Sequence, residues 1–133
     1  MKKITFILLI GLILPCCDKN ELKVNLNAKD DLAISGTFET INSENITGTI
    51  SLDISDGHYE CSTNLPFGHG AGKLEVNGTK INFIDTLFFA VPALYGPSYV
   101  LSGEHQYEFD GDNLKIWRAK NVGSVEYKLK LIK

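Results

Sequence analysis

Apolar and polar side chains alternate with a period of two residues from position 32 to the end of the chain. In the stretch 46–55, for example, Ile50, Leu52 and Ile54 alternate with serine, threonine and aspartate. Successive side chains of a β-strand point to opposite faces, so this pattern predicts strands with one dry face and one wet face. No stretch of the sequence sustains the 3.6-residue period of an amphipathic helix, and we therefore expect an all-β domain.

A turn dipeptide between two alternating stretches predicts how the first hairpin pairs. Asp56-Gly57 is typical of a two-residue hairpin turn, because both residue types tolerate positive φ. The turn predicts that Ile54 pairs with Tyr59 and that Leu52 pairs with Cys61, with all four side chains facing the core.

Two further turn dipeptides predict two further hairpins. Asn77-Gly78 predicts a hairpin in which Leu74 pairs with Ile81 towards the core, while Glu75 pairs with Lys80 towards water. Asp110-Gly111 predicts the next hairpin. The inner face of that hairpin is predicted to carry His105, Tyr107, Phe109, Leu114, Ile116 and Arg118.

The pattern as a whole predicts about eight strands in succession. Their predicted bounds are 32–40, 46–55, 58–63, 73–76, 79–84, 99–109, 113–118 and 124–132. The glycine-rich stretch 65–73 is predicted as a connection between hairpins. Successive hairpins with one wet face favour a small antiparallel meander closed into a barrel, because closure leaves no strand edge exposed. An open sandwich is the alternative.

The first residues have the pattern of an export signal. Lys2 and Lys3 precede the uncharged stretch 4–14, which is too short for a membrane span of roughly 20 residues. The end of this stretch resembles the lipobox of bacterial lipoproteins, with Leu14 three residues before Cys17. An alternative cleavage point before Cys16 has a rigid proline directly ahead of it.

This resemblance implies a lipoprotein that is anchored to a membrane without a transmembrane helix. We predict a cleaved signal peptide over 1–16, a lipidated Cys17 and polar tether over 17–31, and the barrel domain over 32–133. Thioether lipidation and an N-acyl chain such as palmitate place the protein in the cell envelope. The expected location is the outer membrane, on its periplasmic or its surface face.

Charge and cysteine content exclude some classes of partner and of cross-link. Acidic residues number 16 and basic residues 13, and the basic count includes Lys2 and Lys3 of the signal peptide. No basic stripe is present, so nucleic acid is not an expected partner. With Cys17 lipidated, Cys61 is left as a single cysteine, and we expect no internal disulfide. Cys61 is expected to fill space in the core.

The last third of the chain has a recognisable succession of strands and turns. It consists of a Gly-x-x-x-Tyr strand at Gly103, the turn at Asp110-Gly111, a Leu-x-Ile strand at Leu114 and a final Tyr-x-Leu strand at Tyr127. This succession resembles the closing strands of small lipocalin-like lipoproteins from Bacteroidota. The resemblance implies an eight-stranded barrel of the calycin type and carries over no catalytic residue.

A ligand-binding site is predicted from aromatic residues and one inward arginine. The stretch 85–100 is long for a hairpin connection and rich in aromatic residues, so it forms either a lid that completes the core or the mouth of a binding site. An inward Arg118 needs an anion or a stacking partner, unless it lies at the barrel rim. The predicted ligand contacts are Phe89, Tyr95, Tyr99, Tyr107, Arg118 and Tyr127.

These features favour a binding module over an enzyme. The sequence shows no convergent nucleophile, base and orienting group, and its scattered histidines do not have the spacing of a metal site. No cofactor and no metal are expected. The leading hypothesis is a non-enzymatic envelope lipoprotein that binds an apolar or anionic small ligand or acts as an accessory module. The alternative is an inhibitor that binds an envelope-directed enzyme such as lysozyme, with an envelope protein as partner.

Overall fold

Eight antiparallel strands make up the domain in the computed structural model, which describes residues 23–41, 45–66, 68–87, 101–120 and 123–132. No helix occurs among these residues. The strands are β1 (Leu32–Ile41), β2 (Thr47–Ser55), β3 (His58–Thr63), β4 (His69–Asn77), β5 (Lys80–Asp85), β6 (Gly103–Phe109), β7 (Asn113–Lys120) and β8 (Gly123–Leu131). The predicted all-β fold is confirmed.

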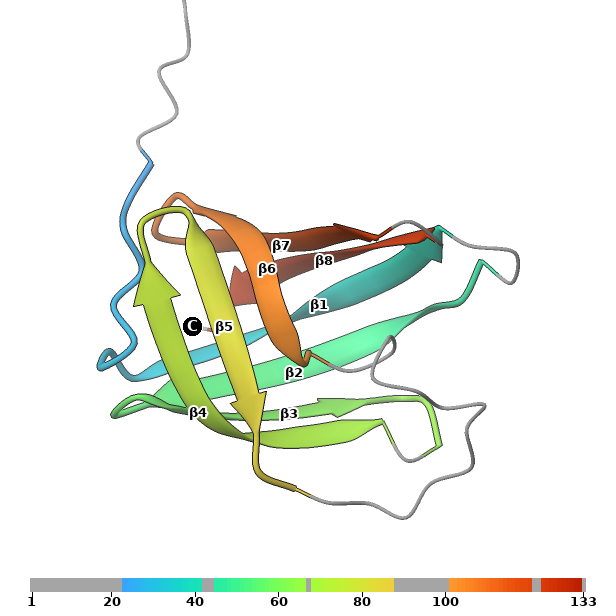
Figure 1. The fold of residues 1–133 in the computed structure, drawn as a ribbon, viewed down its shortest axis with the longest axis horizontal. Helices are drawn as coiled ribbons and strands as arrows, with labels where there is room; N and C mark the ends of the chain where they lie inside the picture. The colour runs from blue at the N-terminus through green and yellow to red at the C-terminus, as the bar shows by residue number, and fades with distance from the viewer. Residues whose placement is uncertain (1–22, 42–44, 67, 88–100, 121–122, 133) are drawn as a thin grey trace, which may run out of the picture.

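The sheet is closed into a barrel (Figure 1). Each strand pairs with the next one along the chain, and β8 returns to pair with β1 from Ile34 opposite Leu131 to Ile41 opposite Ser124. The predicted meander barrel is therefore confirmed, and the open sandwich does not apply.

The barrel has two different ends. The turns at Asp56-Gly57, at Gly78-Thr79 and at 110–112 lie together at one end, called the tip end, on the left of Figure 1. At the opposite end, called the connection end, the chain passes from β1 to β2, from β3 to β4, from β5 to β6 and from β7 to β8. The longest of these passages is 86–102.

The first hairpin has the predicted register. Ile54 lies opposite Tyr59 and Leu52 lies opposite Cys61. Asp56 and Gly57 have φ values of 46° and 75°, as a type I′ turn requires at both central residues. Because this turn twists in the same sense as the strands, it holds Ile54 and Leu52 on the core face, where both are buried.

The predicted register of the second hairpin is wrong by two residues, because the turn lies one residue further along the chain than predicted. Leu74 lies opposite Phe83 and Glu75 opposite Asn82, instead of opposite Ile81 and Lys80. The two central turn residues are Gly78 and Thr79, and Gly78 has a φ of 60°, which a type II′ turn requires at its first central position. The faces are unchanged, because Leu74 and Ile81 are both buried.

Strand β4 begins earlier than predicted, inside the glycine-rich stretch 65–73 that was predicted as a connection. Gly70 pairs with Cys61 and Gly72 pairs with Tyr59, and both glycines are buried. A Cβ atom on Gly72 would overlap the carbonyl oxygen of Ile84. Glycine is needed here because β4 and β5 approach too closely for a side chain, not because the chain must turn.

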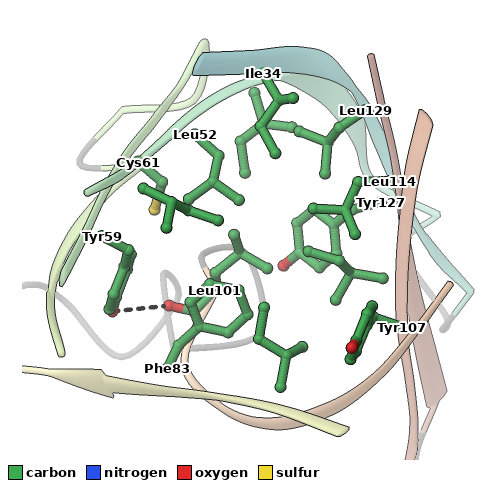
Figure 2. Close-up of a cluster of buried hydrophobic side chains, with 14 of the residues drawn as sticks. Ile34, Leu52, Tyr59, Cys61, Phe83, Leu101, Tyr107, Leu114, Tyr127 and Leu129 are labelled. Carbon is green, nitrogen blue, oxygen red and sulfur yellow. Dashed lines mark hydrogen bonds between the residues drawn. The ribbon is translucent and has the colours of Figure 1, made fainter. Parts of the chain in front are cut away.

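The interior is lined by the dry faces of all eight strands (Figure 2). The predicted inner face of the third hairpin is confirmed, since every residue of it is buried except Arg118, which is half-buried. The core comprises Ile34, Phe38, Ile50, Leu52, Ile54, Tyr59, Cys61, Leu74, Ile81, Phe83, Tyr107, Phe109, Leu114, Ile116, Val125, Tyr127 and Leu129, together with Leu26 and Leu101 from outside the strands.

The segment 23–31 packs across the tip end and does not extend away from the barrel. Leu26 is 3% exposed and belongs to the core. The backbone N–H of Val24 donates to the carbonyl of Phe109 at 2.8 Å, and that of Gly57 donates to the carbonyl of Ala28 at 2.7 Å. Residues 23–31 are therefore part of the folded domain and not of the tether that was predicted over 17–31. The first part of that tether, with Cys17, lies outside the described residues.

Candidate functional site

Five aromatic rings from five strands form a continuous belt inside the barrel. Tyr59 and Phe83 are 4.9 Å apart between ring centroids, Phe83 and His105 are 5.7 Å apart, and His105 and Tyr127 are 6.1 Å apart. Tyr127 continues the belt to Phe38 at 5.8 Å. The first three contacts are edge-to-face, an arrangement that adds about 0.5–1.5 kcal/mol per pair beyond area burial.

The residues just before β6 are held against this belt by two side chains. The hydroxyl of Tyr59 donates to the carbonyl of Leu101 at 3.3 Å, as drawn in Figure 2. Arg118 Nη1 donates to the carbonyl of Ser102 at 2.7 Å. Leu101 itself is fully buried. Arg118 therefore has a backbone carbonyl as its partner, which explains how the predicted inward arginine is tolerated.

The hydroxyl of Tyr127 is the least satisfied polar group of this region. Tyr127 is 0% exposed, and its hydroxyl has no hydrogen-bond partner among the described residues. Figure 2 shows the oxygen pointing towards the centre of the barrel. Burial raises the pKa of Tyr127, although the nearby charge of Arg118 opposes the shift. The phenol is therefore a neutral donor that points into the interior.

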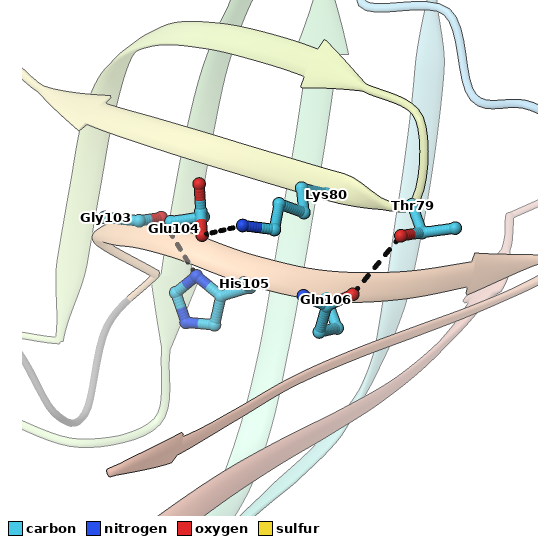
Figure 3. Close-up of polar contacts among 6 residues, drawn as sticks. All are labelled: Thr79, Lys80, Gly103, Glu104, His105 and Gln106. Carbon is cyan, nitrogen blue, oxygen red and sulfur yellow. Dashed lines mark hydrogen bonds and ion pairs between the residues drawn. The ribbon is translucent and has the colours of Figure 1, made fainter.

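His105 and its neighbours on β6 point to opposite sides of the sheet (Figure 3). Nδ1 of His105 lies 3.0 Å from the carbonyl oxygen of Gly103. Because a carbonyl only accepts, this contact requires the proton on Nδ1. Glu104 lies on the outside and pairs with Lys80 at 2.7 Å. Glu104 is therefore directed away from the interior that His105 faces.

Cys61 is a buried free thiol, and its environment suppresses ionisation. Burial raises the pKa of the Cys61 thiol to about 12, while backbone N–H groups of Leu101 and Gly70 partly oppose the shift. The thiolate is the reactive form of cysteine, so Cys61 is chemically inert in the folded state. This agrees with the expectation that Cys61 fills space in the core.

The raised pKa of Cys61 predicts a loss of stability in alkali. An unfolded cysteine ionises near pH 8.5, whereas the folded one stays neutral to about pH 12. The unfolded state therefore releases its proton first, and the free energy of unfolding falls as pH rises between these values. Urea unfolding from neutral to alkaline pH measures the slope. Cys61→Ala is expected to reduce the slope but not abolish it, because burial also raises the pKa of Tyr59. An unchanged slope in the variant would contradict the assignment.

The predicted ligand contacts are only partly brought together. Arg118 lies close enough to Tyr127 for its positive charge to oppose the rise in the pKa of the tyrosine. Tyr107 lies at the tip end, where its hydroxyl donates to the carbonyl of Gly78 and accepts from the N–H of Leu26. The hydroxyl of Tyr107 therefore has both of its hydrogen-bond partners within the protein. The remaining predicted contacts, Phe89, Tyr95 and Tyr99, lie outside the described residues, as does the predicted lipidation site Cys17.

Two shallow grooves on the outside of the barrel were not predicted. One, of about 560 Å³, is lined mainly by serine and threonine residues. The other, of about 480 Å³, has several lysines at its border. Neither groove could be predicted from the sequence, because polar residues are expected everywhere on the wet face of a strand. The hydroxyl-lined groove contains Ser35, Thr37, Thr49, Ser51, Ser62, Thr63 and Asn64, and the other contains Lys23, Lys115, Lys128 and Lys130.

The described residues contain neither a membrane-spanning helix nor a cluster of metal-ligating side chains. No helix among them is long and apolar enough to cross a membrane. No group of three or more histidine, cysteine or carboxylate side chains within the same residues is placed to hold a metal ion. Comparison with protein-family models, with curated proteins and with solved structures finds no match for this chain.

Proposed function

We propose that this chain is a non-enzymatic lipoprotein of the cell envelope, anchored to the outer membrane through Cys17, whose barrel binds a small ligand. The lipobox-like sequence before Cys17 supports the anchor. The closed eight-stranded barrel agrees with the lipocalin-like architecture that the resemblance of the last third implies. Barrels of this size hold at most one small ligand, which bounds the size of what is bound.

The observation that carries the binding proposal is the buried hydroxyl of Tyr127. A buried hydroxyl without a partner costs about 1–3 kcal/mol, so its retention in the core favours a partner that is bound from outside the protein. The positive charge of Arg118 lies nearby. An acceptor such as a carboxylate satisfies both groups, while the aromatic belt contacts an apolar body. The ligand class is therefore an apolar molecule with an acceptor or anionic group at one end.

Replacement of Tyr127 with phenylalanine distinguishes the destabilising effect of the buried hydroxyl from its contribution to ligand binding. In the ligand-free domain, Tyr127→Phe is expected to raise the free energy of unfolding by about 1 kcal/mol, because an unsatisfied polar group is removed. The same change is expected to weaken binding about tenfold, since a hydrogen bond to the ligand is lost. Urea unfolding measures the first effect. Titration with anilinonaphthalene sulfonate, an apolar ring system with an anionic group, measures the second.

Tyr107→Phe is the matched control. It also removes one buried phenolic oxygen, but that oxygen already has two partners at the tip end. The control is expected to lower stability and to leave probe binding unchanged. Equal probe binding by the wild-type protein and Tyr127→Phe contradicts the ligand site. Native mass spectrometry of protein from envelope extracts adds a second readout, since a stoichiometric protein in place of a small molecule supports the inhibitor hypothesis.

A further inference from the structure

We propose that the tip end of the barrel faces the bilayer that holds the lipid anchor, and that the connection end faces away from it. This inference rests on the proposed anchoring at Cys17. The tip end is then an interaction surface, and its partner is the surface of the membrane that holds the anchor.

The first part of the argument is that the chain is fixed to the tip end from Lys23 onward. Lys23 Nζ pairs with Glu108 at 3.0 Å, and the N–H of the next residue bonds to the carbonyl of Phe109. Leu26 is buried in the core, and its N–H donates to the hydroxyl of Tyr107 at 3.3 Å. Further along, Asp31 accepts a hydrogen bond from Ser55. The point at which the anchor segment joins the domain is therefore at one end of the barrel and is fixed by several contacts.

The second part is that the link between anchor and domain is short. Six residue steps separate Cys17 from Lys23. A fully extended chain covers at most roughly 3.5 Å per residue, so the link reaches roughly 20 Å. The strands, of up to 10 residues at roughly 3.3 Å each and tilted by about 40°, give the barrel a length of roughly 25 Å. An inverted barrel would require the link to run along this whole length, which it is too short to do.

The third part is the chemistry of the tip end. Four large apolar side chains are exposed among the described residues: Val24 and Ile132, at 44% and 56%, and Ile84 and Leu87 near the connection end, at 37% and 44%. The exposed pair at the tip end is the one that lies beside the attachment point of the anchor segment. The N–H of Ile132 bonds to the carbonyl of Ala33 at the start of β1, which places it at the same end as Val24. Exposed apolar side chains at an end that is held close to lipid are suited to contact with the headgroup boundary. The tip end also carries exposed carboxylates, which the proposed orientation places in the water around that contact: Asp30, Asp31, Asp56, Asp110 and Asp112.

The orientation is testable by fluorescence quenching with the full lipidated chain. The protein is reconstituted in phosphatidylcholine vesicles that contain a headgroup-attached quencher. A fluorophore is attached to a single engineered cysteine in a Cys61→Ala background, with Asn77→Cys at the tip end and Leu87→Cys near the connection end. Both native side chains are exposed, and a thioether leaves Cys17 without a free thiol. We expect the label at position 77 to be quenched several-fold more strongly than the label at position 87.

A lengthened link provides the control. Insertion of about 20 glycine and serine residues between Cys17 and Lys23 lets the barrel turn over freely, because such a linker spans about 25 Å on average and much more when extended. The difference between the two labels is expected to disappear. Equal quenching in the membrane-bound protein with the native link overturns the orientation and leaves the anchor intact. Failure to associate with vesicles, with no change on Cys17→Ser, overturns the anchor and the orientation with it.

Discussion

Gly36→Val is expected to lower the free energy of unfolding by about 3 kcal/mol or more, the upper end of what overpacking of a core costs. Gly36 lies on β1 opposite Leu129 of β8, at the point where the barrel closes. A Cβ atom on Gly36 would lie within van der Waals overlap of the carbonyl oxygen of Lys128 and 2.7 Å from the Cα of Leu129. Both are backbone atoms of the partner strand, so they cannot move aside without separating β1 from β8.

Urea unfolding of the variant measures this effect, and Ser35→Ala is its control. Ser35 is the neighbouring residue on β1, is exposed, and points to the outer face. Its replacement is expected to change the free energy of unfolding by less than about 0.5 kcal/mol. A Gly36→Val protein as stable as Ser35→Ala would show that β1 and β8 do not approach as closely as described.

Leu26→Ala is expected to lower the free energy of unfolding by about 3 kcal/mol, as for other large-to-small changes in a core. Leu26 is outside every strand, yet it is 3% exposed and packs into the barrel interior. Its loss leaves a cavity at the tip end that a closed sheet cannot fill by collapsing. Val24→Ala is the matched control, because Val24 belongs to the same segment but is 44% exposed.

Truncation of the chain tests the contribution of the segment 23–31 to stability without a substitution. A domain that begins at residue 23 is expected to unfold at the same urea concentration as a longer one that begins at residue 18. A domain that begins at Leu32 is expected to lose the Leu26 contribution and the backbone hydrogen bonds of Val24 and Ala28. Equal stability of all three would mean that the segment 23–31 is a tether after all.

The strand pattern was predictable because local and overall preferences agree in most of the chain. Asp56-Gly57 permits the two positive φ values of its turn, and the alternation around it places Ile54 and Tyr59 on the dry face. When the turn type and the hydrophobic pattern require the same register, no other pairing satisfies both. The first hairpin follows from the sequence for this reason.

The second hairpin shows where local preference is ambiguous. Asn77-Gly78 suits a type I′ turn, whereas Gly78-Thr79 suits a type II′ turn, and both registers keep Leu74 and Ile81 inside. Contacts from a distant strand distinguish them. The hydroxyl of Tyr107 donates to the carbonyl of Gly78, and the N–H of Tyr107 donates to the carbonyl of Thr79. A pattern read along the chain does not contain this information.

The candidate site was predictable in part for the same reason. The period of two placed Arg118 and Tyr127 on the inner face, and the structure keeps them there. What Arg118 contacts depends on how the chain re-enters the barrel at Ser102, which no periodicity specifies. The burial of Leu26 was missed because residues 17–31 are mostly polar. The alternation of Leu22, Val24 and Leu26 is too short to distinguish a segment packed on the core from a tether.

The pairing of the first strand with the last has a consequence for how the chain matures. Synthesis and export both deliver β1 before β8, and until β8 is present one edge of β1 has no partner strand. The hairpins can assemble one after another from local contacts, but the final seam joins residues at almost maximal separation along the chain. Loop-closure entropy makes such a step slow. Until β8 pairs with β1, the sheet therefore remains open, with strand edges that can adhere to other chains.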